Sequence, residues 1–194
     1  MLFRSYSLVS PLMPKSRSFQ LVAAMNERRL VRIARRFEDS TICGYVLAVG
    51  PKFFLLALVS DRLWFDGFEC FRVSDVLSVS PNPYRVFIEA ALKKRGQRRP
   101  RKPKIDLKDI ESLLLTANRA FPLTTIHQEK VDPDVCHIGR VLEIARGRAT
   151  LHAITPHATW DDQPTKLRLS DITRVNFGGD YEDALHIVAG DAAG

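Results

Sequence analysis

The sequence predicts an α+β fold of mainly β type, made of two tandem five-stranded small barrels that are each followed by a helix. Two observations carry this prediction. The segment RVSDVLSV at 72–79 recurs as RLSDITRV at 168–175, with further matches at nearly constant spacing around it. In both halves, short segments of β character are followed by one of helical periodicity. The two halves therefore look like copies of one small domain.

Composition supports two small domains in an ordinary globular protein. The chain has 194 residues, of which 45% are hydrophobic and 26% are charged. The three cysteines, Cys43, Cys70 and Cys136, form no CxxC pair, so neither a disulfide framework nor a zinc knuckle is expected. This favours a reducing compartment, and we expect a cytoplasmic protein without a cofactor. No apolar run approaches 18 residues, so no membrane partner is expected.

Residues 1–24 differ from the rest of the chain because they contain basic residues and no acid. Pro11 and Pro14 interrupt their one apolar patch, which argues against a secretory signal. We interpret 1–24 as a disordered extension, or as a segment upstream of a true start at Met25. A transit peptide is the alternative.

The first unit, 25–95, is predicted to hold a small barrel and a helix. Its strands are expected at 30–35, 41–49, 52–59, 68–73 and 76–79. Gly44 within the second strand indicates a bend or a close backbone approach. Asn82 is a good N-cap and Pro83 a good first residue for the helix. Its predicted inner face consists of Tyr84, Phe87, Ile88, Ala91 and Leu92.

Residues 96–122 are predicted to contain a basic linker, at 97–104, and a connecting helix. Asp106 can cap this helix, which we expect to run from Leu107 to about Asn118. Its apolar stripe consists of Leu107, Ile110, Leu114 and Ala117.

The second unit, 123–190, repeats the order of the first. Its strands are expected at 124–130, 135–144, 148–155, 166–169 and 174–177. Gly139 takes the place that Gly44 has in the first unit. Asp180 can cap the final helix, whose predicted inner face consists of Tyr181, Ala184, Leu185 and Val188.

The strand-two glycines and the Ser-Asp-hydrophobic turns (Ser74-Asp75-Val76 and Ser170-Asp171-Ile172) carry a resemblance to a known group of folds. The pattern resembles SH3-like and Sm-like small barrels, and also uncharacterised bacterial proteins built from such barrels. This resemblance implies a fold and no particular activity. Roll-like sheets backed by the helices are the alternative.

The repeated Ser-Asp pair is a candidate site that we interpret as structural. A serine beside an aspartate resembles part of a catalytic set, but no histidine accompanies the first copy. We expect Asp75 and Asp171 to accept backbone N–H groups in their turns. Gly44 and Gly139 are assigned to the same structural class.

A cluster of basic residues follows the first helix. Its eight members are Lys93, Lys94, Arg95, Arg98, Arg99, Arg101, Lys102 and Lys104. Without them the chain holds 21 basic against 22 acidic residues, so the net charge falls from +7 to −1 and the basic character is local. Such a segment can neutralise several phosphates of a nucleic acid. A solvated linker that keeps two domains apart is the alternative.

All five histidines lie in the second unit, where they raise a metal hypothesis. Cys136 and His137 would be joined by His152, His157 and Asp161. Their spacing matches no standard zinc pattern, and adjacent residues of a strand point to opposite faces. We therefore predict no metal site. Trp64 and Trp160 precede the fourth strand of each unit, where they either pack or anchor a partner.

Together these observations predict a non-enzymatic binding or adaptor module, with nucleic acid as the first candidate ligand. The alternative is a structural or regulatory module that binds protein. An enzyme or a metal site in the second unit ranks third, because no catalytic set emerges from the spacing.

Overall fold

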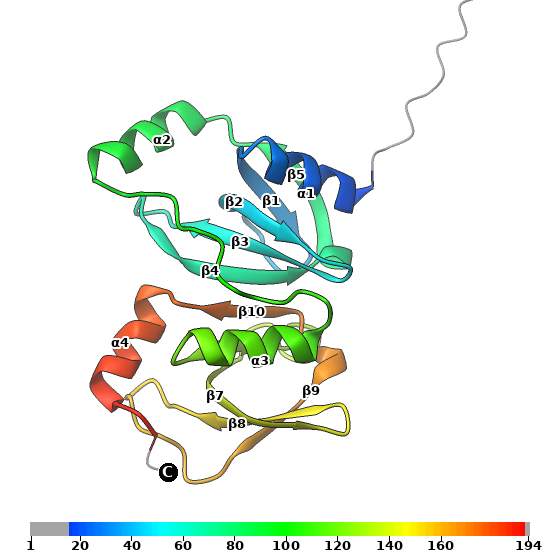
Figure 1. Ribbon diagram of the computed structural model, residues 1–194, viewed down its shortest axis with the longest axis vertical. Coiled ribbons are helices and arrows are strands. Elements are labelled where there is room, and N and C mark those ends of the chain that lie inside the picture. The colour runs from blue at the N-terminus through cyan, green and yellow to red at the C-terminus, as the bar shows by residue number, and fades with distance from the viewer. Residues whose placement is uncertain (1–15, 193–194) are drawn as a thin grey trace, which may run out of the picture.

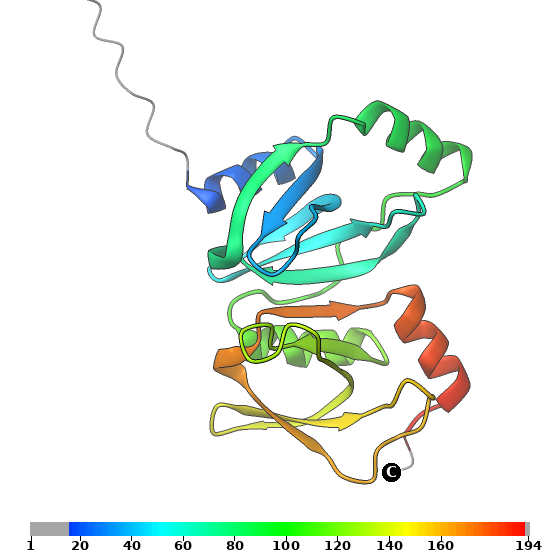
Figure 2. The same ribbon diagram turned by 180° about the vertical axis from the view of Figure 1, so that it is seen from behind.

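The computed structural model describes residues 16–192 and shows an α+β fold (Figures 1 and 2). Within these residues, four helices accompany one ten-stranded antiparallel sheet. The helices are α1 (Arg17–Asn26), α2 (Arg85–Lys94), α3 (Ile110–Ala120) and α4 (Asp180–Ala189). The strands are β1 (Leu30–Arg35), β2 (Ile42–Val49), β3 (Phe53–Val59), β4 (Phe65–Arg72), β5 (Val76–Pro81), β6 (Thr124–His127), β7 (Cys136–Ala145), β8 (Arg148–Ala153), β9 (Thr165–Arg168) and β10 (Arg174–Phe177).

The strand order is β5-β1-β2-β3-β4-β10-β6-β7-β8-β9, so the two halves of the chain share one sheet. Each half contributes five strands, and β4 of the first pairs with β10 of the second, with Glu69 opposite Asn176. The sheet ends at β5 and β9 and does not close. The expected arrangement of two separate barrels is therefore not confirmed, because this direct pairing joins the halves edge to edge.

Every predicted strand is present, although several boundaries differ. Strand β4 begins at Phe65, three residues before the predicted start at 68, and so includes Asp66 and Gly67. A register shift between Ala57 and Val59 lets β3 pair with these extra residues. The repeated Ser-Asp pairs lie in two short 3-10 helices, η1 (Val73–Asp75) and η2 (Leu169–Asp171).

The two largest hydrophobic clusters lie on opposite faces of the sheet at β4. One consists of first-half residues, and the other combines residues of both halves. Phe71 of β4 belongs to the core beneath α1, together with Ile33 and Phe54. Its neighbour Cys70 belongs to the core beneath α3, together with Val175. Successive residues of a strand point to opposite faces, so β4 supplies side chains to both cores.

Residues 17–24 form most of helix α1. The interpretation of 1–24 as disordered is therefore wrong for these residues. Leu21 and Ala24 are buried against the sheet, and the hydroxyl of Ser16 accepts the N–H of Phe19 at 3.2 Å. Leu114 and Ala117 of α3 are buried in the same way before the second half. Burial of an apolar stripe therefore outweighs the basic, proline-bearing context that suggested disorder. Residues 1–15 lie outside the described residues.

Helices α2 and α4 follow the last strand of each half, as predicted, but their inner faces are narrower than expected. Ile88 and Leu92 of α2 are buried, whereas Tyr84 and Phe87 are 66% and 63% exposed. The side chain of Asn82 accepts the N–H of Tyr84 at 2.9 Å, and the helix proper starts after this turn, at Arg85. The predicted inner face of α2 is thus half solvent-exposed.

Helix α4 departs from its prediction in the same way. Leu185 is buried, but Tyr181 and Val188 of the predicted inner face are exposed, and Glu182 is buried instead. Helix α3 begins three residues later than predicted, because Asp109 rather than Asp106 accepts the capping N–H, from Ser112 at 2.7 Å. None of the helices described is long and apolar enough to cross a membrane.

Candidate functional site

The basic segment 93–104, hereafter the strap, links the end of α2 to the loop before α3 (Figure 1, green). The side chains of all eight predicted cations are exposed. None of them forms an ion pair with any residue in 16–192. Their positive charge is therefore available to solvent or to a ligand.

The strap is anchored along the first half of the molecule. A guanidinium N–H of Arg95 donates to the carbonyl of Arg62 at 2.6 Å, and the Arg95 group lies 5.6 Å from the ring of Trp64. The amide oxygen of Gln97 accepts the N–H of Phe65 at 3.1 Å. The strap therefore lies along the first half, and the two halves are joined directly by the pairing of β4 with β10.

Arg99 provides the next anchor. Its guanidinium donates to the carbonyl of Arg28 at 3.3 Å and lies 5.1 Å from the ring of Tyr45, a cation–π contact. Beside it lies a hollow of about 560 Å³, whose lining residues include the apolar Val46 and Leu47. The basic residues around this hollow are Arg28, Arg99, Arg101 and Lys102.

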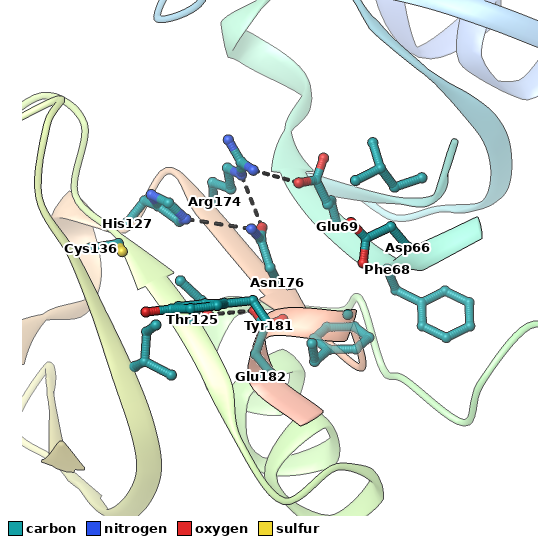
Figure 3. A pocket seen from close by; sticks show the side chains of 14 residues that line it. Asp66, Phe68, Glu69, Thr125, His127, Cys136, Arg174, Asn176, Tyr181 and Glu182 are labelled. Atoms are coloured by element: carbon teal, nitrogen blue, oxygen red, sulfur yellow. Dashed lines mark hydrogen bonds and ion pairs between the residues drawn. The ribbon is translucent and has the colours of Figure 1, made fainter. Parts of the chain in front are cut away.

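A second, smaller pocket of about 300 Å³ lies where β4, β10 and β6 meet (Figure 3). Arg174 points across the junction and forms an ion pair with Glu69. Its Nε donates to Oδ1 of Asn176 at 2.9 Å, and Asn176 Nδ2 lies 3.5 Å from His127 Nε2. Polar side chains from both halves thus converge on one place.

A buried arginine extends this network towards β1. Arg35 is 1% exposed, forms ion pairs with Glu38 and, at 2.7 Å, with Glu129, and lies 4.2 Å from the ring of Phe71. Glu38 is also 3.6 Å from Arg174. We call Arg35, Glu38, Glu69, Glu129 and Arg174 the junction network. Its ion pairs join the two halves through side chains, in addition to the backbone hydrogen bonds between β4 and β10.

Burial shapes the protonation of this network. Burial raises the pKa of Glu69 and of Glu38, against the opposing influence of nearby arginines. Burial is the largest single influence on the pKa of Glu129 and acts upward, but hydrogen bonds to Arg35 and Thr173 together with the positive charge of Arg35 outweigh it and lower that pKa. Burial, helped by the positive charge of Arg174, lowers the pKa of His127 to about 3. His127 is therefore neutral at physiological pH.

The pocket's chemistry favours a structural role. Glu69 and Arg174 pair with each other, and the hydroxyl of Thr125 donates to Glu182 at 2.5 Å. Burial raises the pKa of the Cys136 thiol on the pocket wall, which disfavours the nucleophilic thiolate. The charged groups thus satisfy one another.

The residues of the metal hypothesis do not converge. Cys136 lies opposite His127 in the sheet and His137 opposite Ile126, so the two neighbours face different sides. His152 Nε2 is 3.1 Å from the carbonyl of Asp161. In the part of the chain that the structure describes, no three histidine, cysteine, aspartate or glutamate side chains are grouped to hold a metal ion.

The turn residues have partners other than those expected. Ser74 and Ser170 donate their hydroxyls to Asp75 and Asp171, at 3.4 and 2.9 Å, where we expected backbone N–H donors. The 3-10 turns direct those N–H groups to backbone carbonyls instead, as when Val76 bonds Val73.

The two strand-two glycines make close backbone approaches. A Cβ at Gly44 would lie 2.4 Å from the carbonyl oxygen of Ala57, and one at Gly139 would lie 2.0 Å from that of His152. The tryptophans also pack: Trp160 stacks on His152 with ring centroids 4.9 Å apart, and Trp64 lies under Arg95.

The junction network was not predicted from the sequence. The sequence positions of two members could have indicated buried charges. Glu69 interrupts the apolar run of β4, and Arg35 ends the mainly apolar strand β1. A lone charge in a buried strand needs a partner. That the partners come from the other half of the chain is a property of the pairing between β4 and β10.

No family model, no curated protein and no solved structure matches this chain. The likeness to SH3-like and Sm-like barrels therefore rests on the sequence pattern alone.

Proposed function

We propose that this protein is a non-enzymatic binding module that contacts nucleic acid through the strap. One observation carries the proposal: eight exposed cations, without ion pairs among residues 16–192, lie on a segment that the side chains of Arg95, Gln97 and Arg99 anchor to the first half. A polyanion is the ligand that such a segment attracts most strongly. Ordering the strap in advance reduces the entropy lost on binding.

The hollow beside Arg99 supports the same ligand. Basic residues border this hollow, whose lining also includes the half-buried Leu47, so a phosphate beside the basic side chains and a sugar or base near Leu47 would both find suitable surroundings. The junction network and the shared sheet hold the two halves in one arrangement, which gives the strap a fixed support.

We further propose that each half is a small barrel-like unit of the SH3-like or Sm-like type. The order β5-β1-β2-β3-β4 in the first half corresponds to β10-β6-β7-β8-β9 in the second, which supports this idea. A cytoplasmic location belongs to the same proposal, with three free cysteines as its support.

A salt titration with matched variants tests the proposal. The strap variant carries Arg98→Ala, Arg101→Ala and Lys102→Ala, which spares the anchors Arg95 and Arg99. The control carries Arg148→Ala, Lys166→Ala and Arg168→Ala, which removes as many exposed charges from β8 and β9. Binding of the full chain to labelled DNA and RNA is measured by fluorescence anisotropy.

We expect the logarithm of the affinity to fall linearly with the logarithm of the salt concentration. In the strap variant this negative slope should become less steep by about 2 to 3, whereas the control should leave the slope nearly unchanged. Absence of binding by the unmodified chain at low salt would contradict the proposal, as would equal effects of the two variants.

A protein-binding role is the second candidate, and helix α4 favours it. Ile187 and Val188 are 81% and 74% exposed. Exposed neighbouring apolar side chains are typical of a surface that a partner covers. This role predicts that Ile187→Ser weakens association with a partner and leaves the salt titration unchanged.

A further inference from the structure

We infer that the nucleic acid is bound as a single strand, whose bases stack on Phe87 of α2 and on Tyr84, the N-cap of that helix, while its phosphates follow the strap. The inference rests on the proposed function and specifies its ligand. Its starting point is that both rings are exposed on the helix that leads directly into the strap.

The exposure of these rings has no explanation in the packing of the fold. Helix α2 contacts the sheet through its own residues Ile88 and Leu92. Their side chains form a hydrophobic cluster with Leu30 and Tyr45 of the sheet. Among residues 16–192, neither Phe87 nor Tyr84 is paired with another aromatic ring. Most of the surface of each residue is also exposed, so a ligand can reach the rings.

Phe87 and the first strap cation on its face, Lys94, lie on one accessible side of α2. Phe87 and Lys94 are seven residues apart, so they share a helix face and are separated by about 10 Å along the axis. Lys93 and Lys94 occupy the last turn of the helix, and its first turn contains no acidic residue. A strand that stacks a base on Phe87 can thus place a neighbouring phosphate beside Lys94.

The corresponding helix of the second half lacks this combination. Helix α4 also has an exposed tyrosine, Tyr181, but its first turn contains Asp180, Glu182 and Asp183. These carboxylates would repel a phosphate backbone. Its last turn contains His186 where α2 has two lysines. Aromatic exposure and positive charge coincide on α2 alone of these two helices.

This combination selects a single strand over a duplex. Stacking on a side chain requires an unpaired base whose flat face is accessible, whereas the bases of a duplex are stacked on each other. A positive track with aromatic side chains beside it is the arrangement by which proteins bind single strands without reading their sequence. Phosphate contacts alone would give no such preference.

The test compares one oligonucleotide of about 12 nucleotides as a single strand and as a duplex, each labelled and titrated with the full chain at low salt. We expect the single strand to bind more tightly. Phe87→Ala should weaken single-strand binding about 5- to 150-fold and leave duplex binding unchanged. Phe87→Leu, which keeps the apolar volume but not the ring, should behave like Phe87→Ala.

Two further variants complete the experiment. Val86→Ala removes an equally exposed aliphatic side chain from the same helix and should leave the affinity unchanged. Phe87→Trp should retain binding, and its fluorescence should be quenched when a base stacks on the indole. Since Phe87 is mostly exposed, all variants should keep the circular dichroism spectrum of the parent chain.

The possible failures are distinguishable. If neither single strand nor duplex binds, the proposed function is wrong and this inference falls with it. If both bind equally and Phe87→Ala has no effect, the proposed function stands and the single-strand inference is wrong. Loss of binding to phosphatidylserine vesicles by Phe87→Ala, with unchanged single-strand binding, would assign the rings to a membrane surface and overturn the inference.

Discussion

Arg174 of β10 forms an ion pair with Glu69 of β4, which links side chains 105 residues apart in the chain. Glu69 is almost fully buried, so its charge depends on this partner. The pair lies on the seam between the two halves and is backed by Arg35 and Glu129. The halves are therefore held together by a buried polar network as well as by backbone hydrogen bonds.

Removing one member of this pair should destabilise the whole protein. Arg174→Ala leaves Glu69 buried without its partner, and we expect a loss of about 3 kcal/mol in the free energy of unfolding. Urea denaturation measures the effect. The control is Arg85→Ala, which breaks the exposed pair between Arg85 and Glu89 and should cost less than about 1 kcal/mol. Equal effects of the two variants would show that the buried pair adds nothing.

The buried histidine predicts how stability depends on pH. The pKa of His127 is about 3 in the folded protein and near 6.5 in the unfolded chain. Its stabilising contribution is complete above pH 6.5 and is lost as the pH falls towards 3, because only the unfolded chain takes up the proton. Glu38 and Glu69, whose pKa values are raised, contribute in the opposite direction.

A His127→Gln variant isolates this contribution. Between pH 6.5 and 4, its stability should decline less steeply than that of the parent chain, by up to about 1.4 kcal/mol per pH unit. Urea midpoints at several pH values provide the measurement. Parallel curves for the two proteins would mean that His127 titrates normally in the fold.

Helix α1 gives a direct test of whether residues before Met25 belong to the fold. Leu21→Ala creates a cavity beneath the helix and should cost about 3 kcal/mol, measured by thermal or urea unfolding. Val22→Ala on the partly exposed side of the same helix should cost less than about 1 kcal/mol. If both variants match the parent chain, α1 does not pack on the sheet.

The close approach at Gly139 should be intolerant of any side chain. A Cβ there would lie 2.0 Å from the carbonyl oxygen of His152, and backbone cannot move aside easily. We expect Gly139→Ala to cost about 3 kcal/mol or more. Gly96→Ala meets no atom within 4 Å and should cost about 1 to 2 kcal/mol through its positive φ alone. A reversed order of the two losses would rule out the steric explanation.

Arg98 and Arg99 are neighbours with different expected effects on stability. Arg99 lies over Tyr45 and bonds the carbonyl of Arg28, so Arg99→Ala should lower the free energy of unfolding by about 0.5 to 1 kcal/mol. Arg98→Ala removes an exposed charge and should leave stability unchanged. Melting temperatures at a single salt concentration compare them, and equal values would show that Arg99 anchors nothing.

Local features of this fold could be predicted from the sequence, whereas its long-range pairing could not. Short segments of β character between turn residues located the strands. The strand predicted at 30–35, for example, matches β1. No local pattern indicates which strand pairs with the free edge of β4. The pairing of β4 with β10, which joins the two halves, was therefore not predicted. Helix α1 was missed because its charged surroundings outweighed the spacing of Leu21 and Ala24.

The candidate site was also predictable only where its features are local in the sequence. The eight cations of the strap were found because charge is visible in the sequence. Their anchoring on Arg28, Tyr45 and Trp64 depends on tertiary contacts. The exposure of Phe87 was mispredicted, because its spacing from Tyr84 and Ala91 is that of one helix face, whereas only Ile88 and Leu92 of the predicted face are buried.

The pairing of β4 with β10 has a consequence for the synthesis of the chain. A ribosome completes Glu69 105 residues before it reaches Arg174, a delay of about 5 to 20 seconds. During that interval β4 is an open edge, which is prone to pair with other chains. Truncation before β10 would leave this edge permanently open, so a translation product of the first half alone should depend on chaperones to remain dispersed.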